Sequence, residues 1–113
     1  YWGTWLTCEE WNKGQVWEVD PWGKTPGRMT RLGGGGRSYE SAAYDNRDPT
    51  KPKFFITTDE PDGPLVRYSP ASSVASAAVS SGNYSTLLHS NGGTLEYFVV
   101  TNISEIPNGI ASG

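Results

Sequence analysis

The sequence contains very little cysteine or histidine. Cys8 is the only cysteine and His89 the only histidine. A single cysteine allows no disulfide within the chain, so a disulfide framework is excluded. Cys8 lies among apolar positions of an expected strand, which favours a buried structural thiol over an activated nucleophile. For His89 a surface or hydrogen-bonded side chain is favoured over a metal ligand.

Basic clusters and long apolar runs are also missing. The net charge is −3 and no block of lysine and arginine occurs, so nucleic acid is not an expected partner. No apolar run approaches the roughly 18–20 residues that a membrane helix requires, so no membrane span is predicted. A length of 113 residues indicates one small domain or a piece of a larger one.

Turn formers and aromatic residues are abundant instead. The chain has 14 glycines, 8 prolines and 5 tryptophans, and it lacks the periodic runs of alanine, leucine, glutamate and lysine that helices favour. This pattern predicts short strands joined by tight turns, an all-β fold. Residues 38–45 and 93–103 are expected strands, whereas residues 70–82 fit either a loop or a weak helix.

An internal repeat relates two stretches that lie 49 residues apart. Residues 5–21, WLTCEEWNKGQVWEVDP, align without a gap with residues 54–70, FFITTDEPDGPLVRYSP. Each copy reads as a strand, a loop with acids and a glycine, a second strand and a proline, which ends the strand. We expect the two matched glycines, Gly14 and Gly63, to supply the positive φ that a hairpin loop needs.

The length of the repeat indicates the architecture. Strand repeats of about 40–50 residues are typical of propeller blades. We therefore predict a partial β-propeller over residues 1–113, about two blades of a larger propeller, with repeat units at about 1–49 and 50–113. Propellers need at least about four blades. The sheet edges are therefore expected to meet the remainder of the propeller or another protein chain.

Some of the same residues resemble a known family. The stretches WGTWLTCEE and VWEVDP, then GR-x-x-E, and then R-Y-x-P resemble the PhoX family of alkaline phosphatases, including the divergent PhoX-like proteins of algae. The resemblance runs from about Trp2 to Pro70. It implies a β-propeller that is usually secreted or periplasmic, carries calcium and iron in its central channel and hydrolyses phosphate esters. The expected location is extracellular, periplasmic or an organelle lumen.

The resemblance also implies roles for five residues. It places carboxylate ligands of calcium or iron at Glu9, Glu10, Glu40 and Asp59, and a phosphate contact at Arg37. Two departures from the family pattern are present. Tyr39 stands where the family commonly has histidine. A glycine-rich segment with a cysteine that helps to hold iron precedes WGTWL in the family and is not part of this chain.

The acids can be read from the repeat as well. Neighbouring side chains of a strand point to opposite faces, so only one of Glu9 and Glu10 faces a central channel. We expect this to be Glu10, because Asp59 occupies its place in the second copy. Carboxylates gathered around a channel repel one another unless a cation lies among them, and calcium suits such a site. The alternative is a solvated turn with exposed acids.

Three functions remain open at this point. The first is a portion of a metal-dependent phosphate-ester hydrolase that is inactive as an isolated chain. The second is a non-catalytic PhoX-like scaffold, a structural or binding subunit of an extracellular or lumenal assembly. Acids that face solvent or pair with arginine favour this second function. The third is carbohydrate binding, which needs two or more tryptophan rings exposed on one face; Trp11 and Trp22 are the tryptophans expected to be exposed.

Two glycosylation sequons complete the picture. Asn83 and Asn102 each begin an Asn-x-Ser tripeptide. In a secreted eukaryotic protein either asparagine is a possible glycan acceptor. Such tripeptides also occur by chance.

Overall fold

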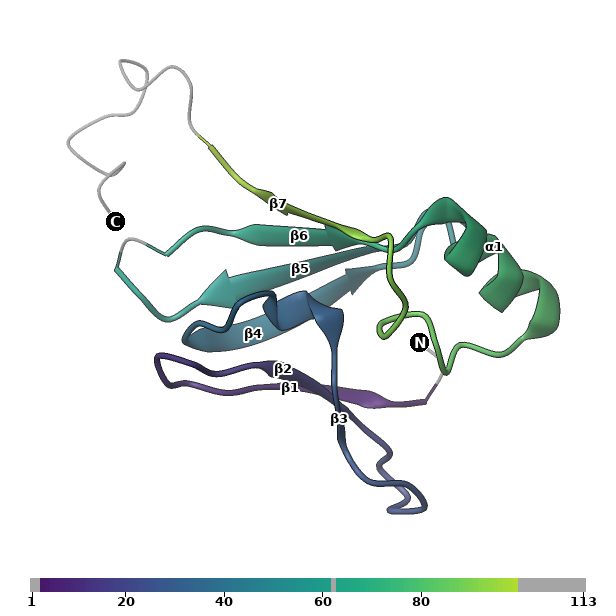
Figure 1. Cartoon of the computed structure of the whole chain (residues 1–113), viewed down its shortest axis with the longest axis horizontal. Coiled ribbons are helices and arrows are strands. Elements are labelled where there is room, and N and C mark those ends of the chain that lie inside the picture. The colour runs from purple at the N-terminus through teal and green to yellow at the C-terminus, as the bar shows by residue number, and fades with distance from the viewer. Residues whose placement is uncertain (1–2, 62, 100–113) are drawn as a thin grey trace.

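The computed structural model describes residues 3–61 and 63–99, which form two antiparallel sheets and one short helix (Figure 1). The strand order is β1-β2-β3 in the first sheet and β4-β5-β6-β7 in the second. The elements are β1 (Trp5–Cys8), β2 (Val16–Val19), β3 (Arg28–Met29), the 3-10 helix η1 (Arg31–Gly33), β4 (Tyr39–Asp45), β5 (Lys53–Thr58), β6 (Val66–Ser69), α1 (Ser72–Ser81) and β7 (Thr94–Tyr97). The all-β prediction is confirmed at this level, and the described strands form no closed sheet.

The two copies of the repeat fold as hairpins with the same register. Trp5 pairs with Val19 in the first hairpin, and Phe54 pairs with Tyr68 in the second. Each residue of the second pair lies 49 positions after its counterpart in the first. The ungapped alignment therefore reports a real equivalence of strand pairing.

The repeat extends to a third strand once an insertion is allowed for. Strand β3 pairs with β2 as β7 pairs with β6, but β7 lies 68 residues after β3. Between equivalent paired positions the second sheet therefore has 19 more residues than the first. The longer connection contains α1 and residues 82–93. Strand β4 has no equivalent in the first sheet, and it lies before residue 49. The boundary between the two sheets in the sequence therefore differs from the expected boundary between the repeat units.

The matched glycines permit close packing and do not supply positive φ. Neither Gly14 nor Gly63 has a positive φ, so that expectation is wrong. A Cβ on Gly14 would lie 2.8 Å from the Cβ of Glu9, and one on Gly63 would lie 2.6 Å from the Cβ of Thr58. Glu9 and Thr58 are again 49 residues apart. In both loops the chain returns so close to the end of the first strand that only glycine fits.

The small-residue segment forms α1, which resolves the choice between loop and helix. Alanine has the highest helix propensity, and Ala75 and Ala78, one turn apart, are buried. Gly82 adopts the left-handed conformation and donates its N–H to the Ala78 carbonyl, which ends the helix. No helix within the described residues has the length and apolar character that crossing a bilayer requires.

One hydrophobic core joins the two sheets, which lie as two layers (Figure 1). Val16 comes from the first sheet, and the partly buried Leu6 and Cys8 pack against the core. The position of Cys8 agrees with its prediction as a structural thiol. The buried residues of the second sheet and of the insertion are Tyr39, Phe54, Ile56, Val66, Tyr68, Ala75, Ala78, Leu87 and Leu88. The insertion therefore helps to hold the two sheets together.

The two faces that meet in this core are not equivalent under the repeat. Phe54 and Tyr68 are buried in the second sheet, and their counterparts in the first sheet are Trp5 and Val19. Trp5 is 63% exposed, and the first sheet buries its opposite face, which carries Val16. The sheets thus stack head to tail. The first sheet leaves free the face equivalent to the one that the second sheet buries, and the second sheet leaves free the face equivalent to the one that the first sheet buries.

Candidate functional site

Glu9 closes the first hairpin loop. Its Oε2 atom accepts a hydrogen bond of 2.8 Å from the backbone N–H of Gln15. The adjacent Trp17 indole lowers the pKa of Glu9 most, although its Nε1 atom makes no hydrogen bond of ordinary geometry, and the Gln15 amide and Trp11 lower it further. The carboxylate is therefore held as an anion by the loop itself.

The other predicted metal ligands face solvent. Glu10, Glu40 and Asp59 are all exposed. Within residues 3–61 and 63–99, no three histidine, cysteine, aspartate or glutamate side chains lie close enough to hold a metal ion. The described residues do not form a calcium or iron site on their own. The metal roles stay predictions, and they require ligands from further repeats.

Arg37, the predicted phosphate contact, is paired with an acid. Its NH1 atom lies 2.9 Å from Oε2 of Glu60. The other carboxylate oxygen of Glu60 accepts a hydrogen bond of 3.3 Å from the Ser38 amide. An anionic ligand would have to displace Glu60 before it engaged the full charge of Arg37.

Residues 37–39 connect the two acidic loops. The N–H of Tyr39 donates to the Glu9 carbonyl at 2.9 Å, and the N–H of Asp59 donates to the Ser38 carbonyl at 3.0 Å. Backbone hydrogen bonds thus bring both acidic turns to the same end of the stacked sheets.

Tyr39 is a structural residue in this fold. It is 4% exposed, and its hydroxyl donates a hydrogen bond of 2.6 Å to the Gly33 carbonyl. Burial raises the pKa of this hydroxyl. The side chain that stands in the place of the family's histidine is therefore neutral and already bonded.

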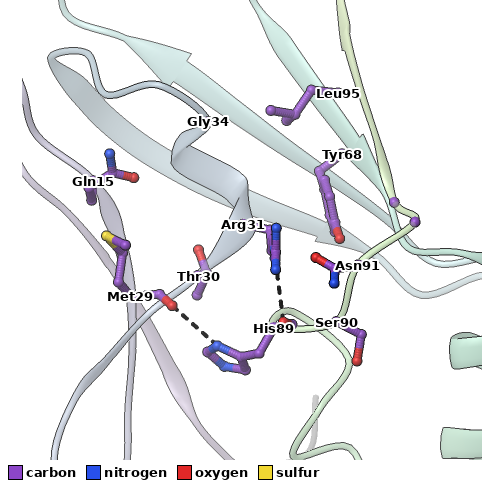
Figure 2. A pocket seen from close by; sticks show the side chains of 12 residues that line it. Gln15, Met29, Thr30, Arg31, Gly34, Tyr68, His89, Ser90, Asn91 and Leu95 are labelled. Carbon is purple, nitrogen blue, oxygen red and sulfur yellow. Dashed lines mark hydrogen bonds between the residues drawn. The ribbon is translucent and has the colours of Figure 1, made fainter.

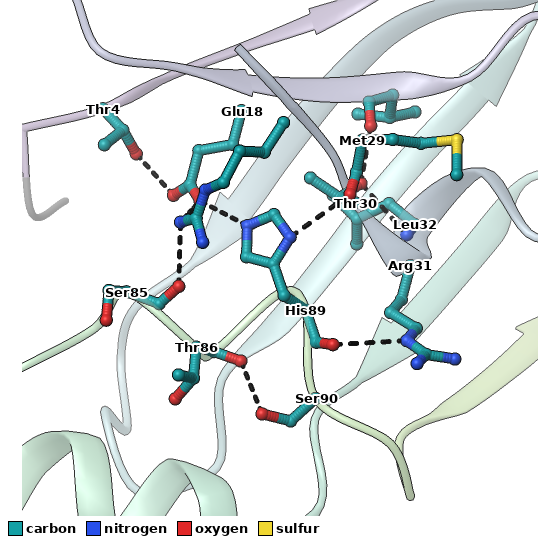
Figure 3. Close-up of polar contacts among 12 residues, drawn as sticks. Thr4, Glu18, Met29, Thr30, Arg31, Leu32, Ser85, Thr86, His89 and Ser90 are labelled. Carbon is teal, nitrogen blue, oxygen red and sulfur yellow. Dashed lines mark hydrogen bonds and ion pairs between the residues drawn. The ribbon is translucent and has the colours of Figure 1, made fainter. Parts of the chain in front are cut away.

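The sequence analysis missed a polar cluster around Glu18 (Figure 3). Glu18 lies in β2 and is 3% exposed. Its Oε2 atom accepts a 2.7 Å hydrogen bond from the Thr4 hydroxyl, and its Oε1 atom lies 3.1 Å from Arg28 NH2 and 2.7 Å from His89 Nε2. Arg28 also donates to the Ser85 carbonyl at 2.8 Å. The cluster fixes the insertion of the second sheet to the first sheet.

His89 is bonded on both sides of its ring. Its Nδ1 atom lies 3.2 Å from the Met29 carbonyl, opposite the contact with Glu18. This confirms the interpretation of His89 as a hydrogen-bonded histidine. The cluster is not a nucleophilic triad, because the Thr4 hydroxyl donates to Glu18 and not to the imidazole. No local sequence pattern signals a pair of residues that are 71 positions apart.

The cross-strand ion pair of this cluster recurs in the second sheet with its charges exchanged. Glu18 lies opposite Arg28 in the first sheet, and Arg67 lies opposite Glu96 at the equivalent positions of the second. The Arg67 Nε donates to Glu96 at 2.8 Å. Glu18 of the first pair is buried and Arg28 is about half exposed, as are both members of the second pair.

A second polar region is a pocket of about 580 Å³ between η1, β6, β7 and residues 89–93 (Figure 2). Arg31, Tyr68, Asn91 and Leu95 are among its lining residues. No motif in the sequence indicated this pocket, because its walls come from four separate segments. Among the described residues that line it, none is an aspartate or a glutamate.

The exposed tryptophans do not form one platform. Trp5, Trp11 and Trp22 are 63%, 53% and 79% exposed, which confirms the prediction for the last two. Trp11 lies in the loop before β2, and Trp22 lies in the turn after it. The two rings therefore lie beyond opposite ends of β2, an arrangement that does not favour carbohydrate stacking.

The Asn83 sequon lies on an exposed turn that follows α1. Asn83 is exposed, and its side-chain oxygen accepts a hydrogen bond of 3.0 Å from the Ser85 amide. The sequon of Asn102 lies outside the described residues. Glycosylation at either asparagine stays a prediction.

Comparison of the chain with protein-family models, with curated proteins and with solved structures returns no match. The likeness to the PhoX family therefore stays a hypothesis based on the residues quoted for it. The geometry of the sheets and of the acidic residues is the basis for a functional proposal.

Proposed function

We propose that the chain is a non-catalytic repeat module of a propeller-like stack of sheets, with a structural or binding role in a larger assembly. The observation that carries this proposal is the head-to-tail stacking of the two sheets. Phe55 and Arg67 on the outer face of the second sheet correspond to Leu6 and Glu18, which the first sheet turns toward the core. A further sheet that repeated the same contact would cover this outer face.

The outer face of the first sheet supports the same proposal. Trp5 is largely exposed there, and Trp17 and Val19 are half-buried. Their counterparts in the second sheet, Phe54, Val66 and Tyr68, form its contribution to the core. Large apolar side chains on a sheet face are typical of a surface that another layer covers. Head-to-tail contacts close into a ring when the rotation between units allows it.

The acidic residues favour a scaffold over an enzyme. Arg37 pairs with Glu60, and Glu10 and Asp59 face solvent. Tyr39 has its hydroxyl bonded within the core. None of these arrangements offers a preformed group that activates a nucleophile or stabilises a transferred phosphoryl group.

The test measures self-association of the chain through its free faces. Sedimentation velocity over a range of concentrations should show weak, concentration-dependent association, because each free face matches a face of the other sheet. Phe55→Lys and Trp5→Ser should each reduce the association. Trp22→Ser is the matched control, since Trp22 is 79% exposed in a turn outside both faces. A chain that stays monomeric at high concentration, or that associates equally as all three variants, would contradict the proposal.

A phosphate-ester hydrolase is the second candidate, and one observation favours it. Residues 37–39 bond to both acidic loops and so bring them to one end of the sheets. In this hypothesis Glu10, Glu40 and Asp59 bind calcium or iron together with ligands from further repeats, and Arg37 leaves Glu60 to contact the phosphate ester. Glu9 has only its second carboxylate oxygen free of the Gln15 bond for such a role.

Elemental analysis of native, purified material separates the two candidates. Calcium and iron at whole-number ratios per chain, with hydrolysis of p-nitrophenyl phosphate that is lost in Asp59→Asn, would support the hydrolase. Glu96→Gln is the control, because Glu96 belongs to an ion pair on the outer sheet face. Absence of bound metal and of activity would support the scaffold.

A further inference from the structure

The pocket between η1, β6, β7 and residues 89–93 contains an unbalanced positive charge. Arg31 makes no ion pair with any described residue, and its Nε atom donates only a long hydrogen bond of 3.4 Å to the His89 carbonyl. The lining of the pocket includes no carboxylate within the described part of the chain. His89 also lines the pocket, but its Nε2 atom faces Glu18. One guanidinium therefore determines the charge of the cavity.

The hydroxyl of Tyr68 points into the same space (Figure 2). Tyr68 is 3% exposed, and in residues 3–61 and 63–99 its hydroxyl has no hydrogen-bond partner. Figure 2 shows this hydroxyl, the Arg31 guanidinium and the Asn91 amide converging on the pocket. Burial raises the pKa of Tyr68 and the nearby Arg31 opposes the rise, so the hydroxyl keeps its proton near neutral pH. The hydroxyl is therefore available to donate a hydrogen bond to a ligand in the pocket.

The position of Tyr68 is fixed by a glycine. A Cβ on Gly93 would lie 2.7 Å from the Cε2 atom of the Tyr68 ring. Gly93 thus leaves room for the hydroxyl and the adjoining ring edge of Tyr68, which lie against its backbone beside the pocket. The donor is therefore placed by the fold before any ligand arrives, which reduces the entropy lost on binding.

We propose that this pocket binds a small organic monocarboxylate, whose carboxylate pairs with Arg31 and accepts a hydrogen bond from the Tyr68 hydroxyl. The planar guanidinium matches a carboxylate through two parallel hydrogen bonds. A single cation balances one negative charge, so a phosphate dianion would keep an uncompensated charge in the site.

The rest of the pocket fits the organic part of such a ligand. Leu95 and the ring of Tyr68 supply apolar surface, and Asn91 supplies an amide. A volume of about 580 Å³ falls within the range of about 300–1,000 Å³ that is usual for small-molecule sites. The pocket lies apart from the outer faces of the sheets, so this proposal does not depend on what covers those faces.

Calorimetric titration of the full chain with benzoate tests the proposal. Benzoate should bind, and benzamide, which has the same shape and no charge, should bind at least about tenfold more weakly. Arg31→Gln should weaken benzoate binding by about tenfold or more, and Tyr68→Phe by about three- to tenfold, since it removes only the hydroxyl. Arg47→Gln is the control, because Arg47 is exposed, pairs with Asp45 and lies outside this pocket.

Three outcomes would overturn the proposal. The first is no heat of binding at millimolar benzoate. The second is equal binding of benzoate by the parent chain and by Arg31→Gln, when the amide NMR spectrum shows that the variant is folded. The third is tighter binding of inorganic phosphate than of benzoate, which would assign the pocket to inorganic oxyanions. Arg31→Lys gives a further check, because it keeps the charge and should still lose affinity with the loss of the planar fork.

Discussion

His89 Nε2 lies 2.7 Å from Glu18 Oε1, a contact between residues that are 71 positions apart. The other ring nitrogen lies 3.2 Å from the Met29 carbonyl. The imidazole is thus held between the Glu18 carboxylate of β2 and the Met29 carbonyl of β3. The contact fastens the insertion between β6 and β7 to the first sheet.

Glu18→Gln should destabilise the protein by about 2–3 kcal/mol, because it removes the buried carboxylate that accepts from Arg28 and contacts His89. The free energy of unfolding in urea measures this loss. Glu96→Gln is the matched control, since it breaks the equivalent ion pair of the second sheet, which is half exposed; its cost should stay below about 1 kcal/mol. Equal losses in the two variants would show that the cluster around Glu18 adds nothing beyond a surface pair.

Gly14→Ala and Gly63→Ala should each lower the free energy of unfolding by about 1–3 kcal/mol, because the added Cβ overlaps the end of the preceding strand. Gly35→Ala is the control. No heavy atom lies within 4 Å of a Cβ built on Gly35, and its φ is not positive. Thermal unfolding of the three variants checks this prediction. A neutral Gly14→Ala would show that the first loop relaxes without loss.

The Glu9 carboxyl should titrate below its ordinary value of 4.5, since Trp17 and the Gln15 amide favour the charged form. A carboxyl whose pKa is lowered by folding stabilises the protein above its unfolded pKa, and this stabilisation disappears as the pH falls through the folded pKa. NMR titration of the side-chain carboxyl measures the shift. Glu9→Gln should remove this part of the acid sensitivity, and an ordinary titration of Glu9 would exclude the loop contact.

Asp45 is a second carboxyl whose pKa is lowered by the fold. Arg47 bonds to the Asp45 carboxylate and lowers its pKa from 3.8 to about 2. The stabilisation is therefore complete above about pH 4 and is lost between about pH 4 and pH 2. Arg47→Gln should return the Asp45 titration toward 3.8, as NMR of the carboxyl carbon would show. Lys51→Gln, in the same turn, should leave it in place.

The hairpins were predictable because their signals are local. Alternating apolar residues, an acidic loop and a final proline recur after 49 residues, and both hairpins have the predicted strands in one register. Strand β3 escaped prediction because two residues, Arg28 and Met29, are too few for an alternation pattern. The helix was ambiguous because its amphipathic face consists only of Ala75 and Ala78, and contact with the core decides its conformation.

The candidate sites were less predictable than the fold. Glu10 and Asp59 were predicted as ligands because they belong to the repeat and to the stretches that resemble the PhoX family. The sequence does not indicate that a neighbouring acid, Glu60, pairs with Arg37. The Glu18 cluster and the pocket beside Arg31 depend on the long connection between β6 and β7. A connection of this kind has no periodic pattern that would indicate which strand it approaches.

The exchanged ion pair affects how well another repeat module can pack on the second sheet. On the first sheet the insertion presents His89 to Glu18. At the equivalent position of the second sheet an identical insertion would meet Arg67, whose guanidinium pairs with Glu96. A second copy of this chain would therefore cover the outer face of the second sheet without the histidine–carboxylate contact and associate only weakly, whereas a unit with an acid at the place of His89 would pair with Arg67. The order of charges in one cross-strand pair thus favours contact between different units over strong association of identical ones.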